Sequence, residues 1–146
     1  MSNKIDEKVK HLLREKKIEE ANKILGYNFY IEGPVMHGLE NGRKINFPTV
    51  NLEVDEKILP DGVYITKTTV DGKVYKSMTN IGTHPSVSEL AKPIIETHLL
   101  HFSEFIYDKI IKVEFFKFIR EQKKFPSLDA LKEQLKKDLI TTENYD

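Results

Sequence analysis

The stretch Val63–Val70, Asp71-Gly72 and Lys73–Ile81 (VYITKTTV, DG, KVYKSMTNI) decides the fold of this chain. Both runs are rich in the β-branched and aromatic residues that strands favour. Asp71-Gly72 is a dipeptide that suits a two-residue hairpin turn, because both of its positions tolerate a positive φ. The stretch therefore predicts a β-hairpin, and an antiparallel sheet built around it.

Strand-like runs also occupy residues 27–36, 47–54, 94–102 and 110–119, and Gly33-Pro34 in the first of them suggests a bulge or a bend. Periodic apolar residues predict helix over the first 25 residues, with a break at Lys16-Lys17 and an end at Gly26. A last helix is expected to begin near Ser127, a good N-cap, and its apolar side is Leu128, Leu131, Leu135 and Leu139. We therefore predict a mainly β fold, a six-stranded antiparallel barrel with a helical linker at 1–26 and a barrel domain with its C-terminal helix at 27–146.

The composition is typical of a globular domain, with 146 residues of which 39% are apolar and 32% charged. The 23 basic and 23 acidic side chains give a net charge of zero, which argues against a nucleic-acid partner. No apolar run approaches the roughly 20 residues that cross a membrane, and the sequence does not start with a signal-peptide pattern. We expect a cytoplasmic monomer that acts without nucleic acid or membrane.

Phe47-Pro48-Thr49-Val50-Asn51 is the first candidate for chemistry. Residues i and i+2 of a strand share a face, so the Thr49 hydroxyl and the Asn51 amide oxygen would lie together. Oxygen ligands of this kind suit Mg²⁺, which takes its remaining ligands from water and phosphates. The preceding loop, residues 33–44, has three glycines whose amides could surround a phosphate, and it ends in Arg43-Lys44. The alternative is a hairpin loop that needs glycine only for its turn.

Glu96 is the second candidate, within the run Ile94–Leu100. Strand alternation places it on the face of Ile94, His98 and Leu100, and a carboxylate beside apolar residues suits a general base. The alternation leaves a second interpretation open, in which Ile95, Thr97 and Leu99 form the core face and Glu96 meets solvent. A zinc site made of Glu96, His98 and His101 is disfavoured, because the spacing of a zinc-binding HExxH motif requires a helix.

Taken in order, these motifs resemble the riboflavin kinase family, over residues 27 to about 138. The family's loop G-x-V-x-x-G-x-x-x-G-R is matched at 33–43, its PTAN signature by Pro48-Thr49-Val50-Asn51, and its E-x-H-L-L run at 96–100. The remaining matches are G-V-Y at 62–64, N-I-G-x-x-P at 80–85, and Arg120-Glu121, Lys124-Phe125 and Ser127-Leu128 near the end. Departures from the pattern include Asn46, His84, His101 and Asp108.

The resemblance implies a Greek-key barrel that phosphorylates riboflavin with ATP to give FMN, using Mg²⁺. It implies that Glu96 is the general base and that Thr49 and Asn51 bind the metal. The implied nucleotide- and phosphate-binding residues are Gly33, Val35, His37, Gly38, Gly42, Arg43, Lys44, Pro48, Thr49, Asn51 and Asn80. The implied flavin-binding residues are Arg120, Glu121, Lys123 and Phe125.

In bacteria this kinase domain is commonly the C-terminal half of a bifunctional FAD synthetase, and residues 18–26 resemble the linker helices between the halves. The nucleotidyltransferase half is absent from this sequence, so the resemblance implies FMN but not FAD as the product. Two other classes stay open. One is a non-catalytic flavin- or nucleotide-binding barrel, and the other is an OB-type nucleic-acid-binding barrel, which the neutral charge disfavours.

Overall fold

The structure is a computed structural model that describes residues 6–36, 49–53, 59–83, 93–101, 109–121 and 124–145, without the side chains of Thr49, Glu53, Thr83, Pro93 and Ile94. Its helices are α1 (Glu7–Arg14), α2 (Ile18–Leu25) and α4 (Leu128–Asn144). Its strands are β1 (Tyr30–Pro34), β2 (Thr49–Glu53), β3 (Gly62–Val70), β4 (Lys73–Thr83), β5 (Pro93–Leu99) and β6 (Ile110–Arg120). No helix in this part of the chain is long and apolar enough to cross a membrane.

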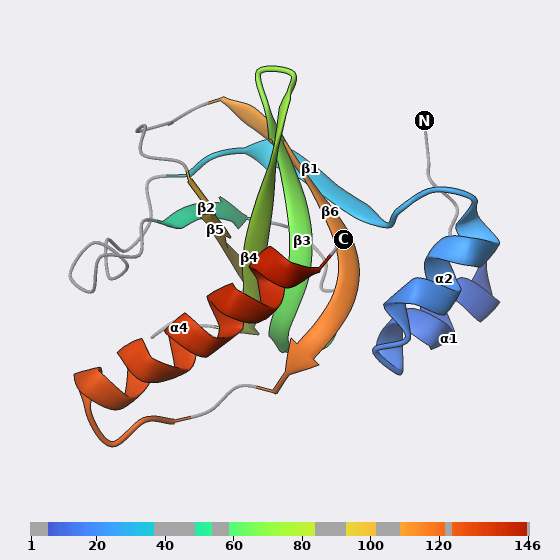
Figure 1. The fold of residues 1–146 in the computed structure, drawn as a ribbon. Coiled ribbons are helices and arrows are strands. Elements are labelled where there is room, and N and C mark those ends of the chain that lie inside the picture. Colours follow the sequence, from blue (N-terminus) through green and yellow to red (C-terminus); the bar gives the residue numbers. More distant parts are fainter. Residues whose placement is uncertain are drawn as a thin grey trace, which may run out of the picture.

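The strands form one antiparallel sheet in the order β1-β6-β3-β4-β5-β2. The consecutive strands β3, β4 and β5 lie side by side, and β6 returns to pair with β3, which is a Greek-key arrangement. The sheet curls until its two outer strands meet, where the amide of Met36 donates to the carbonyl of Asn51 at 2.8 Å. The predicted six-stranded Greek-key barrel is thus confirmed, and Figure 1 shows the strands wrapped around one axis.

The β3–β4 hairpin folds as its sequence predicts. Asp71 and Gly72 both have positive φ, 49° and 80°, as the expected turn requires. A bulge or a bend was expected at Gly33-Pro34, and the bulge is absent, since both residues pair with β6 in unbroken register. The register shifts lie instead between β3 and β6, after Val63 and after Ile65, where they increase the local bend of the barrel wall.

The barrel interior is apolar at its ends and hydroxylic across its middle. Tyr64 and Phe115 meet edge to face, with 5.6 Å between ring centroids. The Tyr64 hydroxyl donates to the Pro60 carbonyl at 2.6 Å, and burial, with a smaller effect of the Asp61 carboxylate, raises the pKa of Tyr64 well above its ordinary value. Five hydroxyls follow, all on buried side chains and bonded in the order Thr68, Ser77, Thr66, Thr79 and Thr97.

Thr66 lies at the centre of this hydroxyl chain, 2.7 Å from the Ser77 oxygen and 2.8 Å from the Thr79 oxygen. Thr66→Val keeps the side-chain shape but leaves two buried hydroxyls each short of a partner. We expect the free energy of unfolding to fall by about 1–3 kcal/mol. Urea denaturation measures this, with Thr69→Val as the control, because half-buried Thr69 lies outside the chain of hydroxyls. Equal stability of the two variants would contradict a structural role for the hydroxyl chain.

The N-terminal residues form the predicted helical hairpin, and it lies beside β6 (Figure 1). The break falls where it was expected, because Lys16 adopts a φ of 65° between the two helices. Asn22 joins the hairpin to the barrel: its amide nitrogen donates to the Phe115 carbonyl at 2.9 Å, and its amide oxygen accepts from the Phe29 amide at 2.8 Å. Buried residues of both helices therefore belong to the same apolar cluster as the barrel interior.

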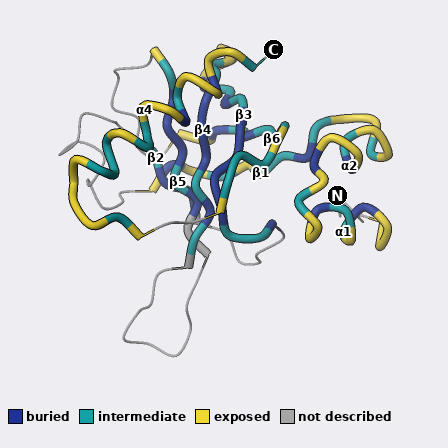
Figure 2. The backbone as a smooth tube through the Cα atoms, turned by 60° about the horizontal axis from the view of Figure 1, so that its bottom comes forward, coloured by how far each residue is buried: buried dark blue, intermediate teal, exposed yellow. Residues whose placement is uncertain are grey.

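Helix α4 lies across β4 on the outside of the barrel (Figure 1). Ser127 caps it, its hydroxyl accepting from the Ala130 amide at 3.1 Å, as the sequence predicts. The expected apolar side is only partly correct, since Leu128 is 53% exposed and the fully buried side chains are Asp138 and Thr142. In Figure 2 burial is concentrated in the strands, while the helices are exposed on their outer sides.

Candidate active site

A row of directly paired residues crosses five strands of the barrel wall. Asn51 of β2 pairs with Glu96 of β5, Glu96 with Asn80 of β4, Asn80 with Val63 of β3, and Val63 with Arg120 of β6. Directly opposed residues of antiparallel strands point to the same face of the sheet. Four polar side chains that are far apart in sequence therefore share one row. The row includes the predicted base, Glu96, and one of the two predicted metal ligands, Asn51.

This row lies on the outer face of the barrel. The neighbours Ile95, Thr97 and Leu99 are buried, and Thr97 bonds to the interior hydroxyl chain, so they are the interior residues of β5. Glu96 therefore faces outward, as in the second interpretation of the alternation. The outer face is not simply solvated, however, because His98 is only 6% exposed and Glu96 is half-buried.

Asn51 and Glu96 are placed for their side chains to meet. The Asn51 carbonyl accepts from Met36 on the far side of β2, so the polar backbone groups of Asn51 point away from β5. Asn51 and Glu96 are thus a non-hydrogen-bonded pair, the kind in which opposed side chains lie closer, with Cα atoms about 4.5 Å apart. An amide oxygen and a carboxylate on adjacent strands can together serve a hydroxyl and a cation-bound phosphate.

The Asn51 side chain has the property expected of a metal ligand. It is 8% exposed, and its Oδ1 is buried without a hydrogen-bond partner among the described residues. Buried acceptors without a donor are rare in folded proteins, and each one needs an explanation such as an ion. A neutral amide oxygen of this kind fits a hard divalent cation. The other predicted ligand, Thr49, pairs with His98 two residues before Asn51 in β2, and its side chain is not described.

Several predicted site residues lie outside the described residues, namely His37, Gly38, Gly42, Arg43, Lys44, Pro48 and Lys123. Of the others, Gly33 pairs with Ile111 at the end of β1, and Val35 is buried in the core. Asn80 lies beside Glu96 in the row. Among the departures from the family pattern, Asn46, His84 and Asp108 lie outside the described residues, and the ring nitrogen of His101 lies 3.1 Å from a carboxylate oxygen of Glu143.

Arg120, at the β6 end of the row, is held on three sides. Its Nε and Nη2 donate to the Asp138 carboxylate at 3.0 and 2.7 Å, and its Nη1 donates to the Glu121 carbonyl at 3.0 Å. Its guanidinium also lies over the Phe125 ring, 5.9 Å from the centroid. Gln134 donates to the same carboxylate at 3.0 Å. Two other predicted flavin-binding residues, Glu121 and Phe125, therefore lie against the guanidinium of the third, Arg120.

The helical hairpin also contacts the end of β6, through Lys16. Lys16 Nζ lies 2.9 Å from a carboxylate oxygen of Glu121 and 4.7 Å from the centroid of the Phe118 ring. The end of β6 is thus held between α4 on one side and the α1–α2 turn on the other. Sequence patterns alone did not indicate Gln134 or Asp138, because polar residues of amphipathic helices normally face solvent, and they indicated Lys16 only as the break between two helices.

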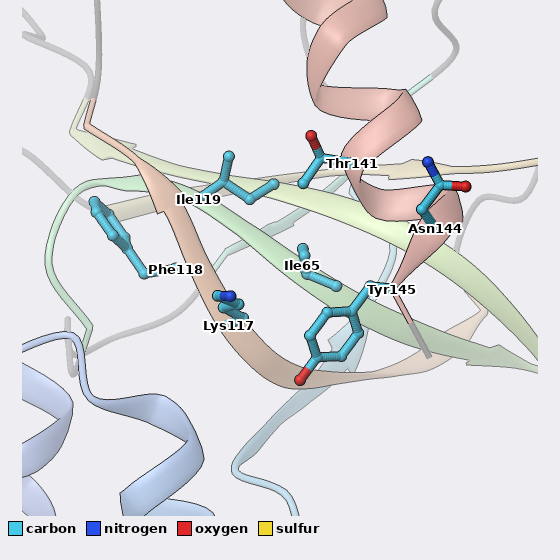
Figure 3. A pocket seen from close by; sticks show the side chains of 7 residues that line it. All are labelled: Ile65, Lys117, Phe118, Ile119, Thr141, Asn144 and Tyr145. Carbon is cyan, nitrogen blue, oxygen red and sulfur yellow. The ribbon is translucent and has the colours of Figure 1, made fainter.

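A cavity of about 400 Å³ lies next to Arg120, between the barrel wall and the last turns of α4 (Figure 3). Ile65 and Ile119 line it from the barrel, and Thr141, Asn144 and Tyr145 line it from the helix end. Ile65 is paired with Lys117, and Val63 with Arg120, so the cavity borders the polar row without including Glu96 or Asn51.

The comparisons with known proteins concern the family and the fold of the chain. The flavokinase family model, described as riboflavin kinase, matches residues 25–145. A curated relative, the bifunctional riboflavin kinase/FMN adenylyltransferase of Bacillus subtilis, is 38% identical over 134 residues, which make up 89% of this chain and 42% of that protein. The chain thus spans less than half the length of this relative.

Two solved structures are similar to the fold. A macrolide-efflux protein from Streptococcus pneumoniae has a TM-score of 0.89 and 29% identity, over 97% of this chain and 47% of that one. Riboflavin kinase from Trypanosoma brucei has a TM-score of 0.55 and 24% identity, over 79% of this chain and 77% of that one, and this likeness concerns the fold alone. The names of the two structures describe different activities, so the fold does not select one. The family model, which matches nearly the whole chain, does: the chain belongs to the riboflavin kinase family.

Proposed function

We propose that this chain transfers the γ-phosphoryl group of ATP to the 5′-hydroxyl of the ribityl chain of riboflavin, giving FMN and ADP. Membership of the riboflavin kinase family supports the reaction class. The single observation that carries the proposal is the pairing of Glu96 with Asn51 and Asn80 on adjacent strands. It joins a carboxylate, a partnerless buried amide oxygen and a further amide in one row.

Glu96 is the general base in this proposal. As the ribityl oxygen forms its bond to the γ-phosphorus, the bond from that phosphorus to the ADP oxygen breaks, and the hydroxyl proton passes to the Glu96 carboxylate. Phosphoryl transfer depends mainly on positioning and electrostatics, so it needs few reacting side chains. The half-buried position of Glu96 suits a base that must meet a substrate hydroxyl without being fully solvated.

Asn51 and Thr49 would hold Mg²⁺, which when bound neutralises charge on the phosphate oxygens. The buried Oδ1 of Asn51, which accepts no bond within the described chain, supports this assignment. The proposed nucleotide contacts are those of the 33–44 loop, Pro48 and Asn80, and the flavin ring would lie near Arg120, Glu121, Lys123 and Phe125. For the flavin, the support is the organisation of Arg120, Glu121 and Phe125 around one guanidinium.

A chromatographic assay of the purified chain with riboflavin, ATP and Mg²⁺ tests the proposal. We expect FMN and no FAD, with no product when ATP is left out. Riboflavin or ADP binding without any FMN would support instead a non-catalytic flavin- or nucleotide-binding barrel. Formation of FAD would show that this chain also carries the adenylyltransferase activity named in its Bacillus subtilis relative.

Asn51→Ala tests the metal assignment. Removing one of few protein ligands should raise the Mg²⁺ concentration at half-maximal rate by about tenfold or more. Initial rates of FMN formation over a Mg²⁺ titration measure the change. Asn144→Ala, an exposed amide at the end of α4, is the matched control and should leave the titration in place. A titration curve for Asn51→Ala that overlies the wild type would remove Asn51 from the metal site.

A further inference from the structure

Asp138 is the most unusual side chain of α4. It is 2% exposed, although most aspartates in amphipathic helices face solvent. Its carboxylate accepts three hydrogen bonds from Arg120, at 2.7 to 3.2 Å, and one from Gln134 at 3.0 Å. A buried charge is stable only when it is paired and hydrogen-bonded in this way. The Asp138 carboxylate therefore attaches the helix to the end of β6, whereas Leu128 at the start of the same helix is exposed.

The partner of Asp138 connects this attachment to the candidate site. Arg120 is the β6 member of the row that carries Glu96 and Asn51, and it pairs directly with Val63. A guanidinium has a fixed planar fork, so a carboxylate that occupies Nε and Nη2 fixes its orientation. The remaining Nη1 is thereby directed to the Glu121 carbonyl, and the plane is presented to the Phe125 ring.

Resting on the proposed function, we propose that Asp138 is a positioning residue for the flavin side of the site. It does not touch substrate. It orients Arg120, and through Arg120 it holds the Glu121 carbonyl and the Phe125 ring, two groups beside which the flavin ring is proposed to lie. Losing its charge weakens riboflavin binding and leaves the phosphoryl-transfer groups Glu96 and Asn51 in place, because they lie on other strands, β5 and β2, whereas the Asp138 carboxylate bonds to Arg120 and Gln134.

Asp138→Asn tests this, because it keeps the side-chain volume and removes the charge that holds both guanidinium nitrogens. We expect the KM for riboflavin to rise about tenfold, the loss of roughly one charge-assisted hydrogen bond. We expect kcat and the KM for ATP to change less than about threefold. Asp129→Asn is the matched control, since Asp129 is an exposed aspartate in the first turn of the same helix. It should leave all three constants unchanged.

Gln134→Ala is a milder second variant, which keeps the folded state testable if Asp138→Asn is too unstable. It removes one bond to the carboxylate without leaving a charge unpaired, so the KM for riboflavin should rise about twofold to threefold. Asp138→Glu, which restores the charge, should recover part of the riboflavin affinity that Asp138→Asn loses. Both results would support the positioning role.

A purely structural salt bridge gives a different pattern. Asp138→Asn would then lower the melting temperature and the active fraction, so kcat would fall with the KM for riboflavin unchanged, and the inference would be overturned. Riboflavin fluorescence quenching measures the dissociation constant without turnover. If the wild type binds riboflavin but forms no FMN, the proposed function fails while the Asp138 variants still test the positioning role. If the wild type does neither, both proposals fall.

Discussion

Glu96→Gln should lower kcat for FMN formation by about 10²-fold or more and leave the affinity for nucleotide nearly unchanged. The substitution keeps the size of the side chain and its place between Asn51 and Asn80, but glutamine cannot accept the ribityl proton. The loss should appear in the chemical step, because Glu96 does not carry the proposed metal. Steady-state assays of FMN formation, together with ADP binding by titration calorimetry, separate the two effects.

Glu32→Gln is the control for this change. It makes the same substitution at an exposed glutamate in β1 that pairs with Lys112, outside the row of Glu96, and it should retain full turnover. Wild-type turnover in Glu96→Gln would exclude Glu96 as the base. Loss of ADP binding together with turnover would mean that the carboxylate serves the nucleotide or its metal, so the role assigned to it would have to change.

Gly62→Ala should lower the free energy of unfolding by about 3 kcal/mol. Gly62 has a φ of 153°, which other residues rarely adopt. A Cβ there would lie 2.5 Å from Cε1 of Phe118 and 3.0 Å from the Arg120 carbonyl oxygen. Phe118 has little room to withdraw, because its ring packs edge-on against Tyr64 with 5.3 Å between centroids.

Thermal unfolding measures this effect, and for a chain of this size the melting temperature should fall by on the order of 10 °C. Two other glycines separate the causes. Gly72 has a φ of 80°, but a Cβ added there would meet open space. Gly72→Ala should therefore show only the backbone cost of about 1 kcal/mol. Gly33→Ala has neither constraint and should be close to neutral. Equal effects at Gly62 and Gly72 would exclude the close approach of Phe118 as the cause.

Local chemistry explains which parts of the fold could be predicted. The Asp71-Gly72 turn, the break at Lys16 and the Ser127 cap each depend on a few neighbouring residues, and all three are found as expected. The apolar side of α4 was only partly right, because an aspartate occupies the buried position that a leucine stripe seemed to claim. Asp138 is buried only because Arg120, 18 residues earlier, supplies its counter-charge. No local pattern contains that information.

In the candidate site, too, local sequence patterns do not determine which residues meet. Alternation alone left the face of Glu96 open, since both sets of β5 residues contain apolar members. Its neighbours in the barrel wall are set by strand order and register, which follow from contacts far apart in sequence. The order of the family motifs singled out Asn51 and Glu96 without their geometry. The pairing of β5 with β2 gives the geometry of Asn51 and Glu96, and its pairing with β4 adds Asn80 as the third member of the group.

The junction between β1 and β2 has a consequence for hydrogen exchange. Among the described residues, it is held by the bridge between Met36 and Asn51, whereas β2 and β5 pair over five residues. The amides of Val50 and Leu52 point toward β5, so their exchange requires β2 to leave the sheet. The amide of Asn51 points the other way, so opening of the junction alone exposes it to solvent. Exchange at Asn51 should therefore be faster than at either neighbour, and a proposed metal ligand would lie at a junction that can open without loss of the β2–β5 pairing.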